Sequence, residues 1–170
     1  ENLVSSASHV LNTSGRMNYS DFEILRGNVN GAGGAVSILL LIVSAVILIM
    51  RRDISLGAFL GTISGTVLLA YCIPVCRNNL DSVKYTLVSN MILFTAIYII
   101  SDKRTAPRKN YYAFFYGFFI AIISYILLLK TKKENIIVII SILFAPLSLA
   151  FRNLENNIEL LRTEEVQEIE

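Results

Sequence analysis

Five long apolar stretches, separated by short polar connections, constrain this chain more than any other feature of its sequence. A membrane-crossing helix needs about 20 residues, usually roughly 17–25, and four of the stretches reach that length while the last is slightly shorter. None of them has an Asp, Glu, Lys or Arg well inside it. The stretches are residues 31–50, 54–75, 83–100, 111–129 and 136–151.

The stretches are continuously apolar and do not alternate between apolar and polar residues, which favours helices over a β-barrel. The chain is 54 % hydrophobic and only 16 % charged, which excludes an ordinary soluble domain of 170 residues. Its net charge of +2 gives no indication of nucleic-acid binding. We therefore predict an all-α fold, a polytopic helical membrane protein with about five transmembrane helices.

This pattern divides the chain into three parts. Residues 1–30 form a polar, extracytoplasmic lead-in, residues 31–151 the transmembrane domain, and residues 152–170 an acidic tail that we expect to form a short surface helix. The chain starts at Glu1 without a signal peptide, so we expect it to be a segment of a longer protein. With residue 1 outside, six basic residues fall in the inside loops and five in the outside loops, which weakly favours that orientation.

Several short motifs predict local structure. Ser20 followed by Glu23 is typical of a capping box at a helix start. The glycine-rich segment at residues 27–34 is either a tightly packed loop at the membrane surface or a place where backbone amides hold a phosphate. Glycines four residues apart, at Gly57, Gly61 and Gly65, predict a flat stripe for close helix packing.

Other polar residues within the stretches give weaker indications. We expect Asn90 to hydrogen-bond a neighbouring helix, because an amide is costly to bury alone. Cys72 and Cys76 could share a metal if both lay on one helix, but two thiols without a third ligand are more typical of buried apolar cysteines. With His9 as the only histidine, the sequence predicts neither a catalytic residue nor a metal site.

Three motifs in order carry a resemblance to one family. They are Val4-Ser-Ser-Ala-Ser8; Gly27-Asn28 followed by Gly31, Gly34 and Ser37; and Asp102 ahead of Tyr116-Gly117 and Phe144-Ala-Pro-Leu147. Together these segments resemble the D subunit of the Rnf electron-transport complex and the B subunit of the sodium-translocating NADH:quinone oxidoreductase. The chain departs from the family pattern at Ser6, Ser8 and Ala35, where the family has Gly, Thr and Glu. The resemblance implies the C-terminal half of a ten-helix subunit of inverted-repeat type.

The resemblance also implies a cofactor. In this family a separate flavin transferase joins FMN through its phosphate to a hydroxyl, which corresponds here to that of Ser8. The other residues implied to bind cofactor are Ser5, Ser6, Ala7, Gly27, Asn28, Gly31 and Gly34. A second flavin, such as riboflavin, is a further expectation.

We therefore expect a membrane subunit of an ion-translocating electron-transport complex in the bacterial inner membrane. It would relay electrons between partner subunits in ferredoxin/NAD or NADH/quinone oxidoreduction, coupled to Na⁺ or H⁺ movement. Its partners would be the other membrane and peripheral subunits, the flavin transferase and the lipid bilayer. Two alternatives stay open, a transporter or channel-like protein and a scaffold subunit without redox activity.

Overall fold

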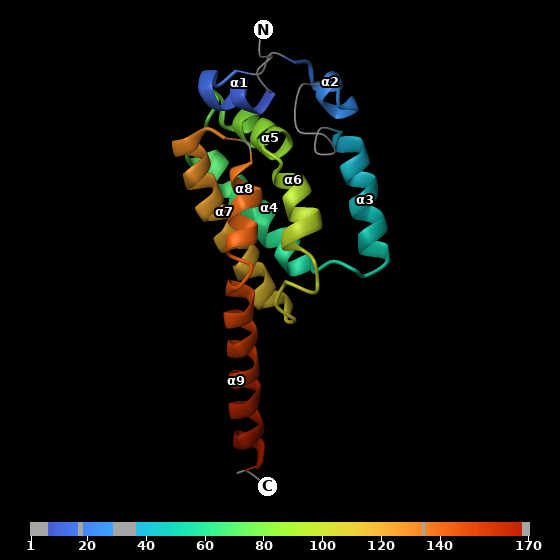
Figure 1. Ribbon diagram of the computed structural model, residues 1–170, viewed down its shortest axis with the longest axis vertical. Coiled ribbons are helices and arrows are strands. Elements are labelled where there is room, and N and C mark those ends of the chain that lie inside the picture. The colour runs from blue at the N-terminus through green and yellow to red at the C-terminus, as the bar shows by residue number, and fades with distance from the viewer. Residues whose placement is uncertain (1–6, 17–18, 29–36, 134, 168–170) are drawn as a thin grey trace.

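The computed structural model describes residues 7–16, 19–28, 37–133 and 135–167, which form helices joined by short loops (Figure 1). Within these residues there is no strand, and Ile54 and Asp102 make only an isolated antiparallel bridge. The predicted all-helical fold is confirmed.

Two helices, α4 (Leu56–Cys72) and α7 (Asn110–Thr131), form the centre of the bundle and run in the same direction. Glycines bring their main chains together: a Cβ atom on Gly61 would lie 2.1 Å from the carbonyl oxygen of Phe114. A Cβ atom on Gly117 of α7 would lie 2.3 Å from the carbonyl oxygen of Ala58. The predicted glycine stripe is therefore a close packing face.

The remaining core gathers around this pair. Side chains of α4 and α7 pack with Ile100 from the π-helical turn η1 (Ala96–Ile100) and Ile140 from α8 (Ile136–Leu143). Helix α3 (Ile38–Met50) lies at the side of the bundle and buries only Leu41 and Ala45 (Figure 1). Its other apolar side chains are largely exposed, as expected for a surface facing lipid or a partner subunit.

The third apolar stretch is a broken helix. Helix α5 (Asn79–Ser89) is capped at its end by Asn90, and Met91 has a left-handed φ of 55°. Helix α6 (Ile92–Thr95) then continues into η1, and the α6–η1 segment is bent by 56° relative to α5. The Asn90 side chain accepts a hydrogen bond of 2.7 Å from Asn12 Nδ2 of α1 (Ala7–Ser14). The expectation that Asn90 bonds a neighbouring helix is confirmed.

The last apolar stretch is also bent, by 44° between α8 and α9 (Leu147–Gln167). The break falls at residues 144–146, where Pro146 has no N–H to continue the helical hydrogen bonds. The sequence placed the end of the span at Phe151 and a separate tail helix after it. In the structure no helix end falls there, because α9 runs continuously across residues 151 and 152 and leads away from the bundle (Figure 1).

The helix lengths agree only partly with five spans. Among the described residues, helix α7, with 22 residues, is long and apolar enough to cross a membrane, and counting each bent pair as one span raises the number to three. Helices α3 and α4 are apolar but shorter, with 13 and 17 residues. Part of the first predicted stretch, residues 31–36, lies outside the described residues. The protein is a helical membrane protein, and the number of five spans stays a prediction.

Candidate functional site

The described part of the predicted flavin-attachment segment lies on helix α1, at one end of the bundle (Figure 1). Ala7 and Ser8 begin this helix, and Ser5 and Ser6 lie outside the described residues. Ser8 is only 3 % exposed, on the same buried face as Leu11 and Asn12. The Asn12–Asn90 hydrogen bond then fixes α1 against the break between α5 and α6.

The second predicted motif, Gly27-Asn28, ends helix α2 (Asp21–Arg26). Ser20 and Glu23 form the predicted capping box at its start, and Gly27 takes a left-handed φ of 84° at its end. The amides of Gly27 and Asn28 both donate to the carbonyl oxygen of Glu23, each at 2.9 Å. Because these two amides are used to end the helix, they are not directed at a phosphate. Gly31 and Gly34 lie outside the described residues.

Helix α2 is held to α5 by a polar contact. The Lys84 ammonium group pairs with the Asp21 carboxylate, and Tyr85 Oη donates a hydrogen bond of 3.2 Å to Asp21 Oδ1. The hydrogen bond from Lys84 lowers the pKa of Asp21 below its ordinary value, since it favours the charged carboxylate.

The described residues line two cavities at this end of the bundle. One, of about 300 Å³, lies beside the end of α1 and is lined by Gly15, Arg16, Cys76, Arg77, Asn78, Asp81 and Tyr85. The other, of about 410 Å³, is lined by Arg26, Gly27 and Asn28. Gly27 and Asn28 line the second of these cavities, and Ser8 lines neither of the two.

The two cysteines do not form a shared site. Helix α4 ends at Cys72, so Cys76 lies beyond it, and the expected position of both on one helix face is wrong. Cys72 is exposed and Cys76 is buried, so only Cys76 fits the prediction of buried apolar cysteines. In the described part of the chain, no group of three His, Cys, Asp or Glu side chains could hold a metal.

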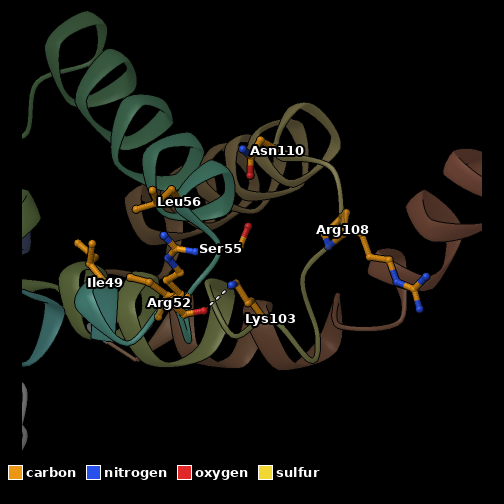
Figure 2. A pocket seen from close by; sticks show the side chains of 9 residues that line it. Ile49, Arg52, Ser55, Leu56, Lys103, Arg108 and Asn110 are labelled. Atoms are coloured by element: carbon orange, nitrogen blue, oxygen red, sulfur yellow. Dashed lines mark hydrogen bonds between the residues drawn. The ribbon is translucent and has the colours of Figure 1, made fainter. Parts of the chain in front are cut away.

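A larger cavity, of about 470 Å³, lies at the opposite end of the bundle and was not predicted from the sequence (Figure 2). It is lined by residues from the end of α3, the start of α4 and the loop that leads into α7. The lining residues are Ile49, Arg52, Ile54, Ser55, Leu56, Lys103, Pro107, Arg108 and Asn110. The sequence signal for it was a set of basic pairs next to apolar stretches, Arg51-Arg52, Lys103-Arg104 and Arg108-Lys109.

The loop beside this cavity is tied to helix α9. The Arg152 guanidinium group donates to the carbonyl oxygens of Arg104 and Ala106, at 2.6 and 2.8 Å. The Glu155 carboxylate, only 3 % exposed, accepts from the amides of Arg108 and Lys109 at 3.2 and 2.9 Å. A carboxylate at the start of α7 also interacts favourably with the positive end of the helix dipole.

Comparison with known proteins decides the family. The model of the NQR2, RnfD, RnfE family matches residues 3–150. This chain belongs to that family. The match covers the candidate N-terminal segment and all the apolar stretches except Phe151, and it confirms the resemblance seen in the sequence. No curated protein matches the chain in a sequence search.

Membership in the NQR2, RnfD, RnfE family establishes the general role. The protein is a membrane subunit of Rnf/Nqr-type complexes, which serve electron and ion transport, and its partners are other subunits of such complexes.

Proposed function

We propose that this protein is a flavin-carrying subunit of an ion-translocating oxidoreductase of the Rnf/Nqr type. It crosses the bacterial inner membrane several times and relays electrons between partner subunits. The observation that carries the proposal is the family match over residues 3–150, which includes the Val-Ser-Ser-Ala-Ser segment ending at Ser8.

Ser8 is the residue that we propose to hold FMN. Its hydroxyl supplies the same oxygen nucleophile as the threonine of the family motif, so the chemistry of a phosphoester fits. When bound, a flavin supplies one- and two-electron transfer, and the protein supplies its position and surroundings.

The burial of Ser8 does not fit attachment to the docked helix. A side chain that is 3 % exposed leaves no path for a transferase. The proposal therefore requires that the flavin transferase reach Ser8 before α1 packs against α5, or after α1 has moved away from it.

The same burial favours a second candidate function, a scaffold subunit that carries no covalent flavin. In this case Ser8 is a buried helix residue of α1, and electron transfer runs entirely through the partner subunits.

Flavin fluorescence in a denaturing gel separates the two functions. The complete protein is co-expressed with a flavin transferase, with Ser8→Ala and Ser14→Ala compared beside it. Ser14 lies on the same helix with an exposed hydroxyl, so its variant controls for the loss of a serine from α1. We expect fluorescence in the unaltered protein and in Ser14→Ala, and none in Ser8→Ala. A dark band for the unaltered protein, beside a labelled positive control, would support the scaffold.

A further inference from the structure

The cavity at the end of the bundle opposite α1 combines positive charge with an apolar wall. Arg52 and Lys103 line it from two different connections, and Figure 2 shows both side chains on the same side of the cavity. The Lys103 ammonium group donates a hydrogen bond to the main-chain oxygen of Arg52. This bond uses one of the three N–H groups of Lys103 and leaves two for a ligand. The Arg108 side chain leads away from this pair (Figure 2).

The acidic residues nearest in sequence do not neutralise this charge. Asp53 pairs with Arg51 at 3.2 Å, and Asp102 Oδ1 accepts a hydrogen bond from the amide of Arg104 at 2.9 Å. The residues that line the cavity include no Asp or Glu. An uncompensated pair of cations is therefore available to an anion.

The main chain adds to the positive potential. Helices α4 and α7 begin next to each other here, since a Cβ atom on Gly57 would lie 2.3 Å from the carbonyl oxygen of Asn110. The start of α7 already has the Glu155 carboxylate, but Ser55 makes no side-chain cap on α4. The start of α4, where Ser55 and Leu56 line the cavity, thus has no side-chain cap from Ser55, and the first amides of a helix carry partial positive charge.

Ser55 adds a hydroxyl group to the lining of the cavity. It is only 7 % exposed and lines the cavity, and its hydroxyl makes no hydrogen bond to another residue in the described part of the chain. Ser55 Oγ is not among the buried side-chain atoms that lack a partner, so this hydroxyl is open to the cavity and free to donate to a phosphate oxygen.

The apolar wall of the cavity indicates what kind of anion fits. Ile49 and Leu56 line the cavity and are 38 % and 47 % exposed. Along the same two helices, Val46 and Leu60 are exposed too, at 50 % and 56 %. The charged cavity therefore continues into an apolar surface on α3 and α4 that suits acyl chains.

We propose that this cavity binds the phosphate group of an acidic phospholipid, with Arg52, Lys103 and Ser55 around the phosphate and the acyl chains along α3 and α4. Arginine and lysine side chains, a hydroxyl group and the start of a helix can all bind a phosphate group. The continuous apolar surface assigns the phosphate to a lipid headgroup instead of a free ion.

Native mass spectrometry of the complete protein in detergent tests the site. The protein is freed of lipid and titrated with phosphatidylglycerol or phosphatidylcholine, and the variant Arg52→Gln/Lys103→Gln is compared with Arg51→Gln/Arg104→Gln. The control pair removes the same charge from the adjacent positions, neither of which lines the cavity. If the double variant does not fold, Lys103→Gln alone, on an exposed loop position, replaces it.

We expect one phosphatidylglycerol to be retained about tenfold better than phosphatidylcholine, since two charge-assisted hydrogen bonds are at stake. The Arg52→Gln/Lys103→Gln variant should lose this preference, and the control variant should keep it. Equal retention in both variants, or equal loss in both, would overturn the site. Displacement of phosphatidylglycerol by an equal concentration of inorganic phosphate would overturn the assignment to a lipid.

Discussion

Gly61 has no room for a side chain, because the main chain of α7 passes directly against its Cα atom. An added methyl group would meet the carbonyl oxygen of Phe114 at 2.1 Å, and main-chain atoms on both helices would have to move. We expect Gly61→Ala to destabilise the protein by about 3 kcal/mol or more, at the upper end of overpacking costs.

The thermal unfolding midpoint in detergent measures this effect, with Leu60→Ala as the control. Leu60 lies on the same helix and is 56 % exposed, so its truncation should change the midpoint little. An unaltered midpoint for Gly61→Ala would mean that α4 and α7 do not pack as closely as described.

Glu155 makes a second contact on which the fold depends. Its buried carboxylate accepts from two backbone amides at the start of α7, and glutamine can keep only one of these acceptors. We expect Glu155→Gln to lower the free energy of unfolding by about 1.5–3 kcal/mol.

The backbone amides of the loop at residues 103–109 should exchange hydrogen faster in Glu155→Gln than in the unaltered protein. The control is Asn156→Ala, because Asn156 is the exposed neighbour of Glu155. Unchanged exchange in Glu155→Gln would show that α9 does not hold this loop.

The glycine stripe and the Ser20–Glu23 capping box could be predicted from the sequence, because fixed spacing along one helix determines them. The roles of Glu155 and Arg152 could not, since their partners lie more than 45 residues away and depend on how α9 meets the loop. The two cysteines were misplaced for a similar reason: the helix that was expected to carry both ends at Cys72.

At the scale of single elements, helix α1 packs against α5. It has only eight residues, too few for an isolated helix to be stable in water, so its docking determines its structure. The side-chain hydrogen bond between Asn12 and Asn90 is buried, and it joins α1 to the broken third stretch.

We expect Asn90→Ala to weaken this docking by about 1–3 kcal/mol, because the Asn12 amide loses its buried partner. Hydrogen exchange of the α1 amides measures the change, with exposed Asn79→Ala as a control on α5. If the transferase needs α1 undocked, flavin loading of Asn90→Ala should be equal to or higher than that of the unaltered protein. Lower loading would contradict attachment before docking.

The positions of the apolar elements could be predicted, because continuous hydropathy marks them directly. The sequence did not predict the break at Asn90, which depends on the buried hydrogen bond with a distant residue. It also ended the last span at Phe151, where polar residues begin, although α9 continues as one helix stabilised by the contacts of Arg152 and Glu155.

At the scale of the whole molecule, the loops at residues 51–53 and 101–109 lie at one end of the bundle, together with α9 (Figure 1). These two loops carry six basic residues, against five in the loops at the other end, so the positive-inside rule weakly favours an orientation with this end inside. We expect the variant Arg104→Cys to react with a membrane-impermeant maleimide only after the cells are permeabilised. The variant Lys133→Cys should react with the same reagent in intact cells.

The native cysteines are replaced by serine for this measurement, because Cys72 is exposed. Labelling of Arg104→Cys in intact cells, with Lys133→Cys protected, would reverse the orientation.

The central claim, that this protein is a working subunit of an Rnf/Nqr-type complex, is tested most directly by purifying it from its native membranes. An affinity tag placed after α9, which leads away from the bundle, should leave the packed helices undisturbed (Figure 1). We predict that the protein brings down flavin- and iron–sulfur-containing subunits in equal amounts, as mass spectrometry and absorption spectra would measure. Purification of the protein alone, without redox subunits under mild detergent conditions, would contradict the account.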